Sequence, residues 1–407
     1  MAEDDPGELL SPAAIEAGYR AAERELGQFN LGLFGITGAG KSTLLNAVFG
    51  VDLAATGIGA PITQTSTLHR TDANRLGIFD TKGLELGTRM DDTLAELRTF
   101  VDTNRLGPES DQLHVIWYCI RAGDRRIQPA EQAFIRGVAG IGIPVVLVMT
   151  QVPLTANGRI HPEAAELADA IRSLQLPVRG DIFFVNALGD DFGGVPVHGL
   201  DSLLDFTEQI APEGVRNALA AAQQVNARLK RERAGEVVKR ATDVVRSKAL
   251  RRKVTGEAWV AMFAEIATIY GLQEAQSRQV LEGSDLIPRA RKLIWAANTG
   301  VFMAPTVALV GATASAVANV ARRGSEKKSV GVGWVAARIT RDLGTAWTVT
   351  CEHYWSQAYP AQPTDLNTDE VAQRFTAELQ RRLPRPLRGT KRERPRIGRG
   401  RRKRRLE

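Results

Sequence analysis

The chain has 407 residues, 43% of them hydrophobic and 24% charged, with a formal net charge of +7. This length and composition support two or three folded domains and exclude an intrinsically disordered chain. The only cysteines, Cys119 and Cys351, lie in apolar runs, and the acidic start MAEDDPGELL lacks the pattern of a secretory signal. We therefore expect a reduced, cytoplasmic setting, with membrane association as an open alternative.

A glycine-rich octapeptide, GITGAGKS, lies near the start of the chain. Asn30–Ile36 predicts a short buried strand and Ser42–Phe49 a helix, so the octapeptide stands at a strand-to-helix turn. Glycines there let main-chain N–H groups surround phosphate oxygens, and the helix N-terminus attracts anions. We expect Lys41 to reach the β- and γ-phosphates and Ser42 to bind Mg²⁺. The predicted phosphate-binding residues are Gly35, Thr37, Gly38, Ala39, Gly40, Lys41, Ser42 and Thr43.

Strands and helices then alternate along the chain. Arg75–Phe79 predicts a strand that ends in Asp80-Thr-Lys-Gly83, where Asp80 is suited to hold Mg²⁺ and the Gly83 N–H to contact the γ-phosphate. Thr63, in the preceding loop, would complete the Mg²⁺ shell. The further predicted strands are Leu113–Ile120, Pro144–Thr150 and Asp181–Val185, with helices at Asp92–Leu106 and His161–Leu174. This order predicts an α/β fold with a mostly parallel sheet covered by helices on both faces.

The segments TGAGKSTLLNAVFG, GAPIT, DTKGLE and NALGDDFGG together resemble Era-type GTPases of the translation-factor-related class, over about residues 28–210. The resemblance implies a P-loop GTPase that binds GTP with Mg²⁺ and hydrolyses it slowly as a molecular switch. The residues that it implies are Lys41, Thr63 and Gly83 in catalysis, Ser42, Thr63 and Asp80 at the metal, and Thr150, Gln151, Asn186 and Ala187 near the base.

Three positions depart from the family pattern. Pro153 stands where an aspartate normally reads guanine, which weakens guanine preference by ~1.5–3 kcal/mol. Leu84 replaces a glutamine that orients water, and Gly38 replaces the asparagine of potassium-activated relatives. A nucleotide-gated helical scaffold with little hydrolysis is therefore the alternative to a GTPase, and a small-molecule kinase is a weaker third option.

The second half of the sequence predicts helices. Residues 213–253 carry a net charge of +8, and their apolar spacing predicts a continuous helix with its basic side chains mainly on the outer face. Such a helix either packs one stripe on its neighbours or binds acidic lipid or RNA. Residues 293–321 contain no charged side chain, a length that suits either a bilayer span or a tight Ala/Gly-rich hairpin.

The resemblance extends to the helical half, because Val260–Gly271 and Thr340–Tyr354 look like a helical domain of unknown function often fused to bacterial Era-type GTPases. Residues 381–407 carry a net charge of +12 and predict a disordered tail that binds polyanions such as ribosomal RNA or anionic lipid. The predicted boundaries are 1–27 for an N-terminal helical segment, 28–212 for the GTP-binding domain, 213–380 for the helical domain and 381–407 for the tail. The sequence does not identify a protein partner, and a homodimer is one of the options.

Overall fold

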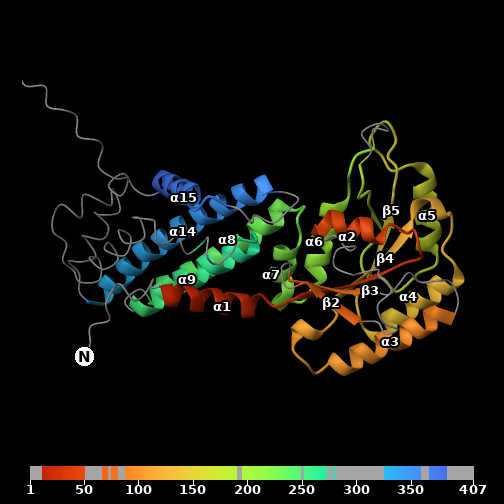
Figure 1. Ribbon diagram of the computed structural model, residues 1–407, viewed down its shortest axis with the longest axis horizontal. Coiled ribbons are helices and arrows are strands. Elements are labelled where there is room, and N and C mark those ends of the chain that lie inside the picture. The colour runs from red at the N-terminus through yellow and green to blue at the C-terminus, as the bar shows by residue number, and fades with distance from the viewer. Residues whose placement is uncertain are drawn as a thin grey trace, which may run out of the picture.

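The computed structural model describes residues 12–50, 67–71, 75–80, 88–189, 195–248, 252–272, 277, 280, 325–358 and 366–382. Figure 1 shows an elongated molecule, with a sheet and its covering helices at one end and a bundle of long helices at the other. The predicted domain boundaries stay a prediction. The uncharged stretch 293–321, the tail beyond residue 382, Thr63, Gly83 and Leu84 all lie outside the described residues.

A six-stranded sheet with the order β2-β3-β1-β4-β5-β6 forms the centre of the first unit. The strands are β1 (Phe29–Phe34), β2 (Thr67–Thr71), β3 (Leu76–Asp80), β4 (Val115–Arg121), β5 (Val145–Thr150) and β6 (Phe183–Phe184). All pairings are parallel except β2 with β3, which confirms the predicted mostly parallel sheet. The antiparallel edge strand β2 was not predicted, since its sequence TLHRT has a single aliphatic residue.

Alternate side chains of the central strands enter two separate cores, as the two-residue period of a strand requires. In β4, Trp117 and Cys119 face the layer of α2, α6 and α7, whereas Ile116 and Tyr118 face α3, α4 and α5. These helices are α2 (Lys41–Phe49), α3 (Thr88–Asn104), α4 (Pro129–Ile141), α5 (Pro162–Ser173), α6 (Leu200–Ile210) and α7 (Glu213–Ala222). The sheet is therefore buried on both faces, and its strand ends are left to carry function.

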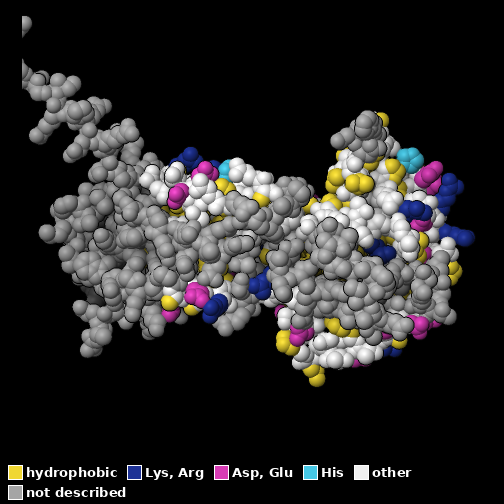
Figure 2. All heavy atoms as spheres, in the orientation of Figure 1, with side chains coloured by type: hydrophobic (Ala, Val, Ile, Leu, Met, Phe, Trp, Pro, Cys, Tyr) yellow, Lys and Arg dark blue, Asp and Glu magenta, His cyan; other side chains and the backbone are white. Residues whose placement is uncertain are grey.

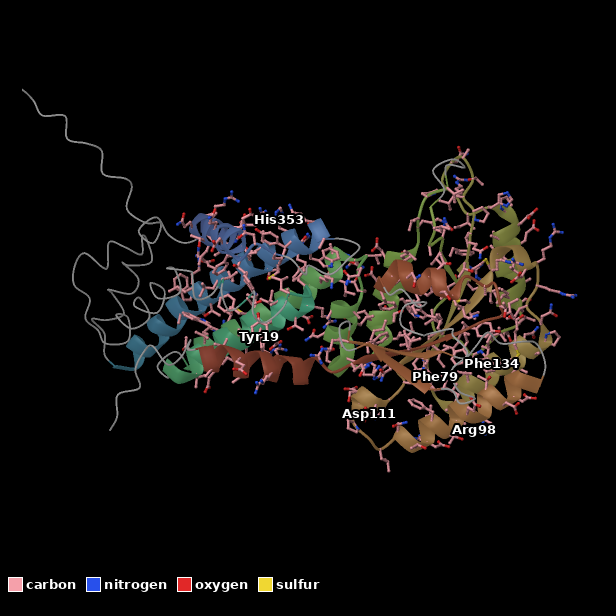
Figure 3. The ribbon with its side chains drawn as sticks, in the orientation of Figure 1. Tyr19, Phe79, Arg98, Asp111, Phe134 and His353 are labelled. Carbon is pink, nitrogen blue, oxygen red and sulfur yellow. The ribbon has the colours of Figure 1, made fainter. Side chains whose placement is uncertain are left out.

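The helical bundle brings together both ends of the described chain. It contains α1 (Pro12–Leu26), α8 (Ala227–Lys248), α9 (Arg252–Ile269), α14 (Ser325–Ala358) and α15 (Thr368–Arg382). Figure 1 shows α1 lying along α9, and Tyr19 of α1, labelled in Figure 3, is buried in the core of the bundle. Gly18 lies so close to Val260 that a Cβ atom there would collide with the valine side chain.

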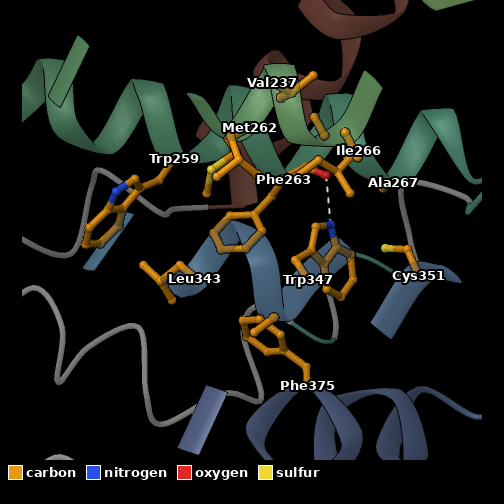
Figure 4. Close-up of a cluster of buried hydrophobic side chains, with 14 of the residues drawn as sticks. Val237, Trp259, Met262, Phe263, Ile266, Ala267, Leu343, Trp347, Cys351 and Phe375 are labelled. Carbon is orange, nitrogen blue, oxygen red and sulfur yellow. Dashed lines mark hydrogen bonds between the residues drawn. The ribbon is translucent and has the colours of Figure 1, made fainter. Parts of the chain in front are cut away.

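Aromatic rings form the centre of the bundle core (Figure 4). The ring centroids of Trp347 and Phe375 lie 5.5 Å apart with an interplanar angle of 85°, and Phe263 meets Trp347 edge-on at 6.0 Å. The Trp347 indole N–H donates a hydrogen bond of 3.0 Å to the Phe263 carbonyl oxygen. Edge-to-face pairs are favoured by the ring quadrupoles, so α9, α14 and α15 are fixed to one another here.

The predicted continuous helix over residues 213–253 is wrong. It divides into α7 and α8 because Gln223 and Asn226 cap the break: the Asn226 N–H donates to Gln223 Oε1, and the Leu229 N–H donates to Asn226 Oδ1. A short polar side chain at a helix start accepts an otherwise unpaired N–H, which favours the new start over continuation. The basic residues are also not all outside, because Lys230 and Arg233 are buried.

Within the described part of the chain, every helix is too short or too polar to cross a membrane.

Two tryptophans on α14 test the bundle core. Trp347 is fully buried and Trp334 is 48% exposed. We expect Trp347→Ala to lower the free energy of unfolding by about 3–5 kcal/mol through the lost packing, as core aromatic deletions do. The matched change Trp334→Ala should cost less than ~1 kcal/mol. Urea unfolding followed by circular dichroism measures both, and equal losses would contradict this core assignment.

Candidate functional site

The turn between β1 and α2 is built from glycines in conformations that other residues disfavour. Gly38 and Gly40 have φ angles of 85° and 77°, in the left-handed region. The Ala39 N–H donates to the Ile36 carbonyl at 3.1 Å, which closes the turn. Gly40 is the N-cap of α2 and has no side chain to cap the first amides of the helix, so their direction favours an anion.

Gly35 approaches the neighbouring strand too closely for any side chain. Its φ angle is 138°, and a Cβ atom at this position would run into the carbonyl oxygen of Cys119 on β4. A Cβ at Gly38, by contrast, would meet nothing within 4 Å. The loop is thus closely packed against β4 at Gly35 and open at Gly38.

The Lys41 ammonium group lies over this loop. Its Nζ donates hydrogen bonds to the carbonyl oxygens of Gly35 at 2.7 Å and Ile36 at 3.1 Å. Ser42 and Thr43 follow in the first turn of α2, and both are exposed. A positive charge, hydroxyl groups and helix amides therefore occur together at the start of α2.

The end of β5 contacts the outer side of the same loop. The buried Thr150 hydroxyl donates to the Ala39 carbonyl at 2.7 Å, and the Gln151 side-chain amide donates to the Gly38 carbonyl at 3.3 Å. Gln151 itself has a left-handed φ of 53°. These bonds bring together four of the predicted site residues and fix the orientation of the loop.

A third segment, which follows β6, lies beside the end of β5. The Val152 N–H donates to the Val185 carbonyl at 3.1 Å, and Asn186 pairs with His198 through two main-chain hydrogen bonds of 3.0 Å. The Asn186 side chain donates to the carbonyl oxygens of Leu188 and Pro196. Asn186 therefore shapes the loop that Ala187 enters, a role that its position in the sequence did not reveal.

Asp80 lies at the same edge of the sheet. In the parallel register it stands opposite Leu33, two residues before Gly35. The carboxyl ends of the parallel strands thus place Asp80, the glycine turn and Thr150 along one edge, as ligand sites of such sheets require.

Sequence reasoning missed Cys119 and His198 as supports of this edge. The Cys119 carbonyl leaves room only for a glycine at position 35, and His198 Nε2 lies 2.9 Å from the Val152 carbonyl. Neither contact leaves a signal in residue spacing, because both are long-range. Cys119 is itself a packed thiol: it is fully buried, and burial raises the pKa of its thiol to about 12.

Part of this chain is similar to a family of known proteins. Residues 30–151 match the family model described as 50S ribosome-binding GTPase. No curated protein sequence matches the chain. Residues 30–151 thus resemble a GTPase domain, and they lie in an α/β unit that a helical region follows.

Solved structures give weaker likenesses. The bacterial selenocysteine-specific elongation factor EF-Sec is 17% identical with a TM-score of 0.29, over 45% of this chain and 28% of that one. A dimerization-deficient mutant of Toc33 from Arabidopsis thaliana is 13% identical with a TM-score of 0.31, over 52% of this chain and 96% of its own. An oligomerised bacterial dynamin pair, described as a mechanism for sensing and tethering membranes, is 11% identical with a TM-score of 0.31, over 93% and 86%. At these scores the likenesses carry no information about function.

Two glycines of the turn test its geometry. Gly35→Ala should lower the free energy of unfolding by more than about 2 kcal/mol, because the new methyl group collides with the main chain of β4 and cannot be relieved by a rotamer change. Gly38→Ala meets open space and should cost only the strain of its positive φ, ~1 kcal/mol. Thermal unfolding of both variants measures the difference, and a Gly38→Ala loss equal to that of Gly35→Ala would contradict the close approach.

Proposed function

We propose that this protein binds GTP with Mg²⁺ and hydrolyses it slowly as a molecular switch. The main support is the glycine turn, whose left-handed glycines and overlying Lys41 suit a triphosphate, within a region that matches a GTPase family. In this proposal the main-chain amides of Gly38–Thr43 receive the β- and γ-phosphates, and Lys41 neutralises their charge.

The residues proposed to hold Mg²⁺ are Ser42, Thr63 and Asp80. Ser42 is exposed at the start of α2, and Asp80 ends a strand of the same sheet edge. Hydroxyl and carboxylate oxygens are the ligands that Mg²⁺ prefers, so the donor set fits the ion. When bound, Mg²⁺ would neutralise charge on the phosphates. Thr63 and Gly83 are proposed on the family resemblance alone.

Turnover is proposed to be slow because Leu84 cannot orient water by a hydrogen bond. The alternative, a scaffold that binds nucleotide and scarcely hydrolyses it, rests on the same residue.

Lys41→Ala tests both the proposed GTPase and the alternative of a nucleotide-binding scaffold. Loss of a charge-assisted contact of ~1.5–3 kcal/mol should weaken GTP binding roughly ten- to a hundredfold and abolish phosphate release. Arg98→Ala is the matched control, since Arg98 is exposed on α3, away from the glycine turn (Figure 3). Fluorescent-nucleotide titration and a phosphate-release assay measure the two effects. Binding without phosphate release in the parent chain would leave only the scaffold, and Lys41→Ala binding as tightly as the parent would contradict the proposed site.

We propose that the site selects only weakly for guanine over other purine bases. The loop between β5 and α5, Gln151 to His161, contains no carboxylate, and its Pro153 carbonyl accepts a hydrogen bond of 3.0 Å from the His161 N–H. The loop therefore offers no anionic acceptor for the ring N–H and 2-amino group of guanine.

Pro153→Asp tests this assignment by gain of function. GTP and ITP differ only in the 2-amino group, so the parent should bind them within about threefold of each other, whereas the new carboxylate should favour GTP by roughly tenfold or more. Pro153 is exposed and its hydrogen bond is made by the main chain, so the substitution fits the loop. Pro153→Asn, without the charge, is the control. A parent that already prefers GTP over ITP by more than tenfold would show that another residue reads guanine.

An anionic partner, ribosomal RNA or an anionic membrane, is proposed to act through the basic tail. Helix α8 is a poorer candidate, because several of its arginines pair with carboxylates of the same chain. These pairs are Arg228 with Asp205 and Glu232, Arg231 with Glu352, Arg240 with Glu265 and Arg246 with Asp243. On the face in Figure 2, described basic and acidic side chains lie intermixed. The ion pairs of α8 favour the hypothesis that this helix packs one side on its neighbours and leaves the other to solvent.

A further inference from the structure

Three helices, α2, α7 and α9, end at one junction, which is formed by the break between α7 and α8 and by the first turn of α8. The last carbonyl groups of a helix have no partner within it and need one from elsewhere. At the end of α2, the Gly50 N–H donates to the Asn46 carbonyl at 2.9 Å, and the Gln224 N–H donates to the Val48 carbonyl at 2.7 Å. The main chain of Gln224 thus caps the helix that begins at the glycine turn.

Lys230, in the first turn of α8, caps the other two helices. Its buried ammonium group donates to the carbonyl oxygens of Ala220 at 2.7 Å and Ala221 at 3.1 Å, at the end of α7, and to that of Ile269 at 2.7 Å, at the end of α9. All three hydrogens of the ammonium group are therefore used. Burial lowers the pKa of Lys230, and the negative ends of two helix dipoles, which face the same ammonium group, oppose that effect.

Trp355 of α14 completes the junction from the bundle side. Its indole N–H donates to Gln224 Oε1 at 2.9 Å in a buried contact, and its ring centroid lies 5.4 Å from Lys230 Nζ. Gln224 therefore contacts the P-loop helix with its main chain and the bundle with its side chain. Gln224 therefore links α2 to α14 through two hydrogen bonds.

We propose that Gln224 and Trp355 couple the nucleotide site to the helical bundle, so that nucleotide binding at the start of α2 and the packing of the end of α14 are thermodynamically linked. This coupling rests on the proposed nucleotide binding. Helix α2 has nine residues, about 13 Å of rigid rod at ~1.5 Å per residue, so a displacement at Lys41 reaches Val48. Lys41 now donates to loop carbonyls, and a bound phosphate would compete for the same ammonium group.

Linkage requires that the effect be reciprocal. If nucleotide stabilises the end of α14, then releasing that end weakens nucleotide binding by up to the coupling factor, which is typically roughly 5- to 150-fold. We therefore expect Trp355→Phe, which removes the hydrogen bond to Gln224 but keeps an aromatic ring, to weaken GTP binding at least about fivefold. Neither residue touches the glycine turn in the described contacts, so a direct effect on phosphate is excluded as the cause.

Trp259→Phe is the matched control. Trp259 is also buried, and its indole N–H donates to Thr340 Oγ1 at 2.8 Å, a bond wholly inside the bundle. The two substitutions make the same chemical change, and only one cuts the contact with Gln224. Gln224→Met is the second variant: it removes the side-chain acceptor and keeps the main-chain bond to Val48, so the coupling stays testable if Trp355→Phe does not fold.

The experiment uses the full chain with a non-hydrolysable GTP analogue and Mg²⁺. Nucleotide affinity is measured for every variant, and hydrogen exchange of residues 348–358 is measured with and without nucleotide. If the sites are coupled, nucleotide binding slows hydrogen exchange of residues 348–358 in the parent and in Trp259→Phe. In Trp355→Phe and Gln224→Met, nucleotide binds more weakly and no longer slows this exchange. A parent that binds nucleotide with unchanged exchange in α14, or equal affinity losses in Trp355→Phe and Trp259→Phe, would overturn the coupling alone. A parent that binds no nucleotide would overturn the proposed function and the coupling together.

Discussion

The placement of helix α2 is the constraint on which the site and the junction both depend. Its first turn follows a glycine loop that only fits because Gly35 has no Cβ atom to meet Cys119. Its last turn is capped from outside by the Gln224 N–H. Between the two ends, Leu44, Leu45, Val48 and Phe49 bury one face of the helix against the sheet. The helix is thus fixed along its length, and the amides proposed to receive phosphate at one end are held relative to the bundle at the other.

Positive charge serves different purposes in different parts of this chain. Lys41 lies over an exposed loop, whereas Lys230 is enclosed by three carbonyl oxygens and an indole ring. The arginines of α8 mostly bind carboxylates on neighbouring helices, so they contribute to local packing more than to a charged surface. A net charge counted along the sequence cannot separate these cases, since burial and pairing are tertiary properties.

Local features were predictable and long-range ones were not. The octapeptide predicted its strand-to-helix turn because glycine, lysine and hydroxyl residues act within a few positions of one another. The end of β5 was placed correctly, but the bond from Thr150 to Ala39 joins residues 111 positions apart and has no sequence signature. The break at Gln223–Asn226 escaped prediction because the apolar spacing of residues 215–229 continues through it, while two side-chain caps decide the outcome. The Gln224 contacts with Val48 and Trp355 arise only when the two units pack.

Isothermal titration calorimetry of the full chain with a non-hydrolysable GTP analogue and Mg²⁺ tests most directly whether the start of α2 receives a triphosphate. We expect a saturable heat with one site per chain in the parent and its loss in Lys41→Ala. A folded parent that gives no heat with any purine triphosphate would contradict this expectation.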